Sequence, residues 1–240
     1  MSEAAKPYTI YDAIAKGYVR IDSHWGSDLD AIKDSLERRI KQNNKVIDLG
    51  CGNGWHLASL SWIYNWGIKA AGVDYSDAML NEAKKEIRRF PEARIELIQA
   101  DILNLPLPDN LFGLAFMLNN TFGVFWQGNV KEAAEKRIAA LREARRVLAS
   151  GGELVFSVYH RNMLESDDSY GTNFRIVKEK TNREMGDLII EYDDGRMTTF
   201  YYSHWFTKEE MGQLAESAGF SLKFLEPRMS RLVGVMRAEK

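Results

Sequence analysis

The feature that most constrains this chain is a short apolar run followed at once by three closely spaced glycines. Residues 46–54 are VIDLGCGNG, and a helix-like stretch begins at Trp55. Glycine lets the backbone adopt positive φ and approach a ligand closely. A strand, a glycine-rich turn and a helix in this order are typical of a nucleotide-type site at the carboxyl end of a parallel strand.

The glycine spacing separates two kinds of nucleotide site. A dinucleotide-binding turn has the pattern G-x-G-x-x-G. Here the glycines stand at positions 50, 52 and 54, so the third is one place early, and the bulky Trp55 follows it. This spacing counts against NAD. A phosphate-binding P-loop is excluded, because no Gly-Lys-Ser/Thr follows the turn.

Apolar runs alternate with helical patterns along the first two thirds of the chain. The runs lie at residues 45–49, 68–73, 94–98, 111–118 and 153–158. Their alternation with helices predicts an α/β fold with a parallel sheet built from right-handed crossover units. Ser76 is expected to cap a helix that begins at Asp77. Gly151-Gly152 is expected to end the long helix Val130–Leu148.

The pattern changes after residue 159, where strands follow one another with little helix between them. The strands expected there lie at residues 174–180, 188–193 and 197–204. Asp194-Gly195 is a hairpin signal, so an antiparallel β-meander is predicted. Thr207 and Glu210 have the spacing of a capping box for a helix that ends at Gly219. Two strands, at residues 220–226 and 232–237, finish the chain.

Composition and charge narrow the classes of function. A formal charge of -2 argues against a nucleic-acid binder that depends on a large basic field. Cys51 is the single cysteine, which excludes an intramolecular disulfide and favours a reducing, cytoplasmic location. Residues 1–7 lack a signal-peptide core, and the most apolar stretch, 111–126, is too short to span a bilayer. No cluster has metal-ligand spacing, so no metal is expected.

Two aspartates follow predicted strands where a nucleotide would bind. Asp74 lies twenty residues after Gly54, and a carboxylate there can accept hydrogen bonds from both ribose hydroxyls. Asp101 ends the third strand, where its carboxylate or the next backbone amide can meet an adenine edge. Either residue alone could equally be a turn former or a helix cap.

Taken together, four stretches resemble class I S-adenosylmethionine-dependent methyltransferases. They are VIDLGCGNG, GVDYS at 72–76, QAD at 99–101 and LREARRVLASGGELVFS at 141–157. The resemblance covers residues 45–158. It implies a doubly wound, Rossmann-like sheet of seven mostly parallel strands whose last strand inserts antiparallel, with the meander as an insertion after strand five. It also implies S-adenosylmethionine as the cofactor.

The resemblance implies a single methyltransferase domain over residues 1–240. Within it we expect an N-terminal helical cap (1–43), a cofactor-binding core (44–160), a β-meander substrate cap (161–206) and a C-terminal helix with two strands (207–240). Tyrosines of the N-terminal helix, Tyr18 among them, would close over the cofactor. The meander could be a substrate lid or a dimer contact, and a homodimer is left open.

The same resemblance assigns the cofactor site. The three glycines make room for the methionine part, Asp74 binds the ribose, Asp101 with Ile102 frames the adenine, and Met79 packs on the adenine side. The full set of expected cofactor-binding residues is Gly50, Cys51, Gly52, Asn53, Gly54, Asp74, Tyr75, Met79, Asp101, Ile102, Asn119 and Tyr18.

Two further segments resemble glycine N-methyltransferases and related small-amine enzymes. Residues 118–122 correspond to a leucine–glycine–asparagine–serine–phenylalanine turn, and residues 160–162 to a histidine–arginine–asparagine run. Asn119 replaces the glycine of that turn, and Tyr159 replaces an acidic residue. Carried over, Asn120 and Arg161 would touch the substrate, with Arg161 pairing a carboxylate. The expected catalytic residues are Asn120, Tyr159, His160 and Arg161.

The leading hypothesis is therefore methyl transfer to a small molecule, most directly to the amine of an amino-acid-like acid. O- or S-methylation of another small metabolite is one alternative. A non-catalytic S-adenosylmethionine-binding module is a second, and an NAD-dependent oxidoreductase is a third. The expected partner is a small-molecule methyl acceptor, with no nucleic acid and no membrane.

Overall fold

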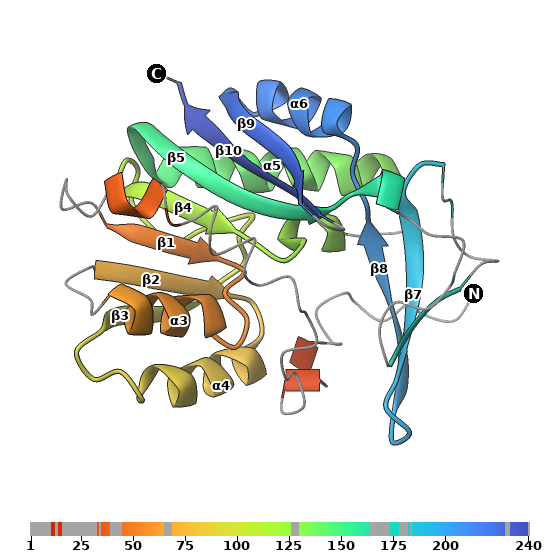
Figure 1. The fold of residues 1–240 in the computed structure, drawn as a ribbon, viewed down its shortest axis with the longest axis horizontal. Coiled ribbons are helices and arrows are strands. Elements are labelled where there is room, and N and C mark those ends of the chain that lie inside the picture. Colours follow the sequence, from red (N-terminus) through yellow and green to blue (C-terminus); the bar gives the residue numbers. More distant parts are fainter. Residues whose placement is uncertain are drawn as a thin grey trace.

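The computed structural model describes residues 11–12, 14–15, 33, 35–38, 45–64, 69–125, 130–163, 173–177, 182, 184–228 and 231–239. In this part of the chain, strands form a seven-stranded sheet and a three-stranded sheet. Helices alternate with the strands of the larger sheet (Figure 1). Among the described helices, none is both long enough and apolar enough to cross a membrane.

The larger sheet has the strand order β3-β2-β1-β4-β5-β10-β9. Strands β1 to β5 pair in parallel, whereas β10 runs antiparallel to both β5 and β9. Its strands are β1 (Val46–Leu49), β2 (Lys69–Asp74), β3 (Arg94–Gln99), β4 (Phe112–Met117), β5 (Leu148–Tyr159), β9 (Phe220–Arg228) and β10 (Arg231–Ala238). This confirms the α/β class and the mostly parallel sheet with an antiparallel insertion.

Helices cover both faces of the sheet, as a doubly wound fold requires. Because side chains alternate along a strand, Ile47 and Leu49 of β1 pack with α5 and α6, while Val46 packs with α3. All six residues of β4 are buried, as expected for a strand covered on both faces. The helices are α3 (Trp55–Tyr64), α4 (Asp77–Ile87), α5 (Val130–Val147) and α6 (Lys208–Ser217), with 3₁₀ turns η2 (Thr121–Val124) and η3 (Arg161–Met163).

The helix starts agree with their sequence signals, but one helix end does not. Ser76 caps α4, and Thr207 with Glu210 forms a complete capping box at the start of α6. The expected end of α5 at Gly151-Gly152 is wrong, because α5 ends at Val147 and β5 runs through both glycines. The β4–β5 register shifts here, and Gly151 takes φ +72, so the glycines accommodate extra residues at the start of a strand.

The smaller sheet is the antiparallel meander expected after strand five, in the order β6-β7-β8. Its strands are β6 (Phe174–Ile176), β7 (Asp187–Asp193) and β8 (Thr198–His204). The meander stands on the side toward which β1 and β2 point (Figure 1). It therefore lies at the carboxyl edge of the parallel strands, where ligands bind in such folds.

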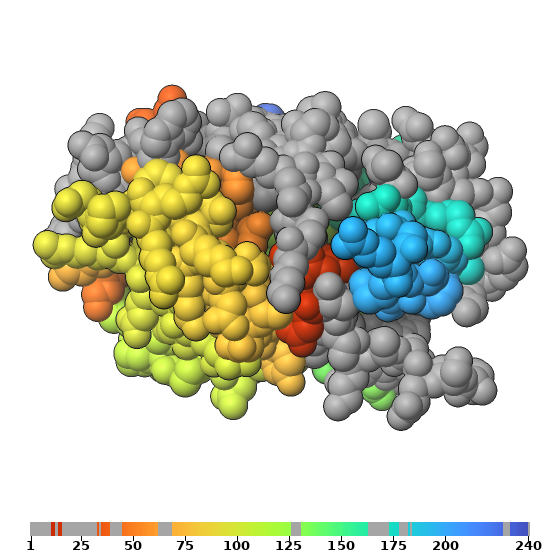
Figure 2. Space-filling model, turned by 90° about the horizontal axis from the view of Figure 1, so that it is seen from below, coloured from red at the N-terminus to blue at the C-terminus, as the bar shows by residue number. Residues whose placement is uncertain are grey.

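A described part of the N-terminal segment bridges the core and the meander. Ile14 and Ala15 pack with Met79 of α4 and Tyr192 of β7. Figure 2 shows this segment, in red, between the yellow α4 and the blue meander strands. Most of residues 1–43, including Tyr18, lies outside the described residues, and the division of the chain into caps and core stays a prediction.

Buried polar side chains join the meander to α6. His204 on β8 contacts Asp187 on β7 at 2.7 Å through Nδ1, and its Nε2 lies 3.4 Å from Glu210. The Tyr202 hydroxyl also donates to Asp187, and Arg161 pairs with Glu210. These contacts pair most of the buried polar atoms, Asp187 Oδ2 excepted, and they fix the meander against the sheet.

This network generates a prediction about acid stability. Burial alone would raise the pKa of Glu210, but hydrogen bonds from His204 and Arg161 outweigh it and lower the pKa to about 2 from 4.5. An acid with a lowered folded pKa stabilises the fold above its unfolded pKa, and this contribution is lost as the pH falls. Denaturant unfolding between pH 6 and pH 2.5 should therefore show a smaller acid-dependent loss of stability for Glu210→Gln than for the wild type.

Glutamine keeps the capping-box geometry, so the variant isolates the charge. Glu216→Gln, exposed at the other end of α6, is the matched control and should follow the wild type. Parallel pH curves for Glu210→Gln and the wild type would contradict the prediction.

Candidate functional site

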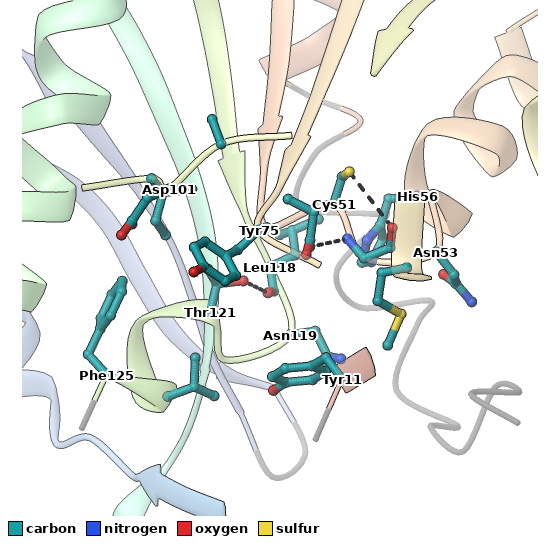
Figure 3. Close-up of a pocket in the computed structure, with 17 residues that line it drawn as sticks. Tyr11, Cys51, Asn53, His56, Tyr75, Asp101, Leu118, Asn119, Thr121 and Phe125 are labelled. Carbon is teal, nitrogen blue, oxygen red and sulfur yellow. Dashed lines mark hydrogen bonds between the residues drawn. The ribbon is translucent and has the colours of Figure 1, made fainter. Parts of the chain in front are cut away.

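A cavity opens at the carboxyl ends of β1, β2 and β4, between the glycine turn and the N-terminal segment (Figure 3). It contains about 860 Å³ of empty space, part of which is open to solvent. Its lining residues are Tyr11, Gly50, Cys51, Gly52, Asn53, His56, Asp74, Tyr75, Met79, Ala100, Asp101, Ile102, Leu118, Asn119, Thr121, Val124 and Phe125. Ten of the twelve residues expected to bind the cofactor thus line the same cavity.

The glycine turn forms one side of the cavity. The backbone amides of Gly50 and Cys51 both donate to the Val73 carbonyl, at 2.8 and 2.9 Å, which folds the turn back onto β2. Gly50 has φ +79, and a Cβ there would lie 2.7 Å from Thr121 Cγ2. Gly52 has φ +53, and apart from its two chain neighbours no residue has an atom within 4 Å of the position that a Cβ would take. Gly52 therefore presents bare backbone to open space that a ligand can fill.

Gly54, the third glycine of the turn, is not one of the lining residues. A Cβ at Gly54 would lie 2.9 Å from the Cβ of Ala83 in α4, and its φ is +72. The missing side chain thus lets the start of α3 pack against α4. Gly54 allows these two helices to pack, and its expected contact with the cofactor stays a prediction.

Asp74 is held rigidly at the end of β2. Its Oδ2 accepts from the Gly52 amide at 2.8 Å, and its Oδ1 accepts from the Ser76 amide at 2.9 Å. Burial raises the pKa of Asp74, and the amide hydrogen bonds only partly offset this effect. Each carboxylate oxygen has a second lone pair, so the group can still accept hydrogen bonds from a ligand's hydroxyls in the cavity.

Asp101 stands on the opposite wall in a tight turn. Its Oδ1 accepts from the Leu103 amide at 2.9 Å, and the neighbouring Ala100 amide donates to the Asp74 carbonyl at 3.0 Å. Apolar side chains complete this part of the cavity, including Met79, which is buried, and Phe125. The arrangement suits a ligand with a hydroxyl-bearing ring near Asp74 and a flat apolar ring between these walls.

Burial shifts the pKa of three titratable groups at or beside the turn toward their neutral forms. Burial raises the pKa of the Cys51 thiol well above its usual value, so Cys51 is not a thiolate nucleophile. Burial lowers the pKa of His56 to about 4, which leaves a neutral imidazole in the wall. Asp48 in β1 is buried, and neither of its carboxyl oxygens has a hydrogen-bond partner in the structure. Its burial, with a smaller effect of Asp74, raises its pKa to about 7.

The residues expected to be catalytic do not line this cavity. Asn120 is buried with φ +61, and its Nδ2 donates to Ser203 Oγ and to the His204 carbonyl. Its Oδ1 accepts from the Tyr159 amide at 3.2 Å. All of its side-chain contacts therefore tie the turn after β4 to β5 and β8, rather than reaching toward a ligand.

Arg161 is also engaged within the chain. Its guanidinium donates to the carbonyls of Trp205 and Glu184, at 3.1 and 3.2 Å, and pairs with Glu210. This leaves it poorly placed to pair with a substrate carboxylate. His160 is buried beside Phe206, and its burial, with the Lys208 charge, lowers its pKa.

Other cavity residues have no signal in the sequence. Thr121 and Val124 belong to η2 and Phe125 follows it directly, beyond the apolar run expected at residues 111–118. A short 3₁₀ turn has no periodicity, so only its position after β4 could have suggested a role. Among the described residues, no group of three His, Cys, Asp or Glu side chains could hold a metal ion.

Part of the chain is similar in sequence to known methyltransferases. Residues 46–152 match a family described as a methyltransferase domain. The demethylmenaquinone methyltransferase of Chlamydia trachomatis is 34% identical over 147 residues, which is 60% of this chain and 58% of that protein. The protein of the same name from Staphylococcus saprophyticus is 28% identical over 186 residues, covering 77% of this chain and 73% of that one. The chain thus spans less than two thirds of the Chlamydia relative.

The whole fold also has counterparts among solved structures. The CcbJ methyltransferase from Streptomyces caelestis superposes with a TM-score of 0.75 and covers 98% of this chain and 99% of its own. The two sequences are 18% identical, so this likeness concerns the fold. It extends beyond residues 46–152 to the meander and the C-terminal strands.

The buried, unpaired carboxyl of Asp48 generates a second prediction. Its folded pKa is about 7 against an ordinary value of 3.8, so its ionisation opposes folding as the pH rises through this range. Asp48→Asn removes that ionisation. Relative to the wild type, the variant should be more stable at pH 8 than at pH 5, and this gain should be at most about 3 kcal/mol.

Urea unfolding at the two pH values measures this gain. Glu92→Gln, an exposed acid in the turn before β3, is the control and should show no such difference. If Asp48→Asn changes the free energy of unfolding equally at pH 5 and pH 8, the Asp48 carboxyl is already ionised in the folded protein at pH 5, and the prediction is contradicted.

Proposed function

We propose that this chain, whose residues 46–152 match a methyltransferase domain, is a class I S-adenosylmethionine-dependent methyltransferase that transfers a methyl group from this cofactor to a small molecule. The observation that carries the proposal is the pairing of Gly52 with Asp74. Bare backbone faces open space at Gly52, and the fixed Asp74 carboxylate stands directly beside it.

These residues fit the cofactor part by part. Asp74 would accept hydrogen bonds from the ribose hydroxyls, and Asp101 with Ile102 would frame the adenine against Met79 and Phe125. The turn at Gly50 and Gly52 would leave room for the methionine part. When bound, S-adenosylmethionine supplies an electrophilic methyl group on a positively charged sulfur.

The protein's main task in such a transfer is to position the acceptor in line with this methyl group and to exclude water. Correct positioning can lower the barrier by about 7–11 kcal/mol, so a strong catalytic base is not obligatory. Tyr11 supports this reading, because it reaches the cavity from the N-terminal segment that packs between α4 and the meander. That segment would cover a bound cofactor.

The identity of the methyl acceptor is a separate part of the proposal. The relatives named above act, by their names, on demethylmenaquinone, and a quinol-type ring is therefore the first acceptor to test. The amine of an amino-acid-like acid stays a hypothesis, but its anchor is weakened because Arg161 pairs with Glu210. O- or S-methylation of another metabolite remains an alternative. A cytoplasmic location, a homodimer and the absence of nucleic-acid partners are also kept as proposals.

The proposal predicts ligand preference and its dependence on Asp74. Calorimetry should show binding of S-adenosylmethionine and of S-adenosylhomocysteine, and no binding of NAD. Asp74→Ala should weaken the affinity for both adenosyl ligands by roughly tenfold to a hundredfold, because hydrogen bonds to a charged group are worth about 1.5–3 kcal/mol.

Asp77→Asn, on the exposed first turn of α4, is the matched control and should bind as the wild type does. Circular dichroism should accompany each variant, because Asp74 also holds the turn through Gly52. NAD binding by the wild type, or unchanged affinity in a folded Asp74→Ala, would refute the proposal.

A further inference from the structure

The 3₁₀ turn η2 lies between the ligand cavity and the meander. Thr121 and Val124 of this turn line the cavity, and so does Phe125, which follows it. Figure 3 shows Thr121 and Phe125 in the cavity wall. Thr121 also packs on the glycine turn, because a Cβ added at Gly50 would come within 2.7 Å of Thr121 Cγ2. A small displacement of η2 would therefore change the space that a ligand finds beside the glycine turn.

This turn is too short to hold its own position. It has four residues, and its N-cap residue Asn120 makes no capping hydrogen bond with its side chain. The hydrogen bonds within a 3₁₀ helix have poor geometry, so contacts from other elements must fix η2 in place. On the meander side, a Cβ added at Gly123 would come within 2.6 Å of the His204 carbonyl oxygen. The backbone of η2 thus lies directly against the end of β8.

Arg137 of α5 holds the middle of η2. This arginine is 3% exposed. Its Nε donates to the Phe122 carbonyl at 3.3 Å, and its Nη2 donates to the Tyr202 hydroxyl at 2.6 Å. Its Cζ lies 5.5 Å from the centroid of the Phe206 ring. The planar fork of one buried guanidinium thus connects the cavity wall to β8 through two contacts at once.

The meander gives this guanidinium a fixed direction and a counter-charge. The Tyr202 hydroxyl accepts from Arg137 and donates to Asp187 on β7, which His204 also contacts at 2.7 Å. Burial would raise the pKa of Asp187, but hydrogen bonds from His204 and Tyr202 and the nearby charge of Arg137 lower it. An ionised carboxylate therefore balances the buried cation. A continuous series of contacts runs from Asp187 through Tyr202 and Arg137 to the Phe122 carbonyl of η2.

We propose that Arg137 is a positioning residue that fixes η2 as a wall of the ligand cavity, and that Tyr202 of the meander orients it. A wall that is held in place before binding costs less to order when the ligand arrives. The inference rests on the proposed function, because S-adenosylmethionine is the ligand expected to contact η2. It gives the meander a part in cofactor binding, in addition to the part as a substrate cap expected from the sequence.

Tyr202→Phe tests this series of contacts with the smallest change. The variant keeps the packed ring and removes the hydroxyl, so Arg137 loses one of these two acceptors and no longer holds η2 in one position. Calorimetry should show that S-adenosylmethionine and S-adenosylhomocysteine both bind about threefold to tenfold more weakly than to the wild type, as expected for the loss of one hydrogen bond. Arg137→Lys keeps the charge but not the fork, and should weaken both ligands at least as much.

Tyr192→Phe is the matched control, because it removes a hydroxyl from the neighbouring strand of the same sheet. That hydroxyl contacts Asp194 in the turn between β7 and β8. The control should bind both ligands as the wild type does. Circular dichroism and urea unfolding of each ligand-free variant separate a loss of stability from a loss of affinity. If Tyr202→Phe lowers the free energy of unfolding but the folded variant keeps the wild-type affinity, Tyr202 has a structural role only and the inference is wrong.

A double-mutant cycle shows whether Tyr202 acts through η2. Val124→Ala shortens a side chain of the wall that is partly exposed, so the core stays intact. If the wall is already displaced in Tyr202→Phe, the two changes together should weaken binding by less than the product of their separate factors. Independent effects would multiply, and that result would contradict the inference.

The outcomes separate this inference from the proposed function. If the wild type does not bind S-adenosylmethionine, the proposed function fails and the inference fails with it. If the wild type binds S-adenosylmethionine but the folded Tyr202→Phe and Arg137→Lys variants bind it equally tightly, the inference alone fails.

Discussion

The hydrogen bonds of Asp74 are the interaction on which the rest of the site depends. One carboxylate oxygen holds the amide of Gly52 in the turn after β1, and the other holds the amide of Ser76, which caps α4. A single side chain at the end of β2 thus joins the glycine turn to the next helix. The hydroxyl of Ser76 in turn donates to Asp12, so the N-terminal segment is tied to the same point. The glycine turn, the start of α4 and the N-terminal segment, which surround the cavity, are therefore held in position by the same group of contacts.

Buried charge is distributed differently in the two halves of the molecule. Near the glycine turn, Asp48 has no hydrogen-bond partner and its burial raises its pKa, which favours the protonated form. Between the meander and α6, the acids Asp187 and Glu210 are paired with His204 and Arg161, and their pKa values are lowered. An unpaired buried acid is tolerated only by holding its proton, whereas a paired one can stay ionised. The first arrangement lies beside a ligand cavity and the second fastens two sheets.

Most of the fold could be predicted from local patterns, because each pattern has a local physical cause. Alternation of apolar runs with helical periodicity predicted the parallel strands, and the caps at Ser76 and Thr207 predicted two helix starts. The glycine pair at 151–152 was misinterpreted, since glycine with positive φ serves both helix ends and irregular strands. Only the pairing of β5 with β4, which is not local, decides between them.

The sequence by itself determined part of the cavity lining, because the turn at Gly50 and Gly52, with Asp74 and Asp101 at successive strand ends, follows from strand order and spacing. The tertiary structure decided which polar side chains make their hydrogen bonds within the chain and therefore do not face a ligand. Asn120 and Arg161 have the chemistry of substrate ligands, but contacts from β8 and α6, far along the chain, occupy them. Arg231 reaches Asn119 only because β10 inserts antiparallel beside β5. The spacing of residues shows which side chains one segment carries. Whether such a side chain can bind a ligand depends on its contacts with segments that are distant in the sequence.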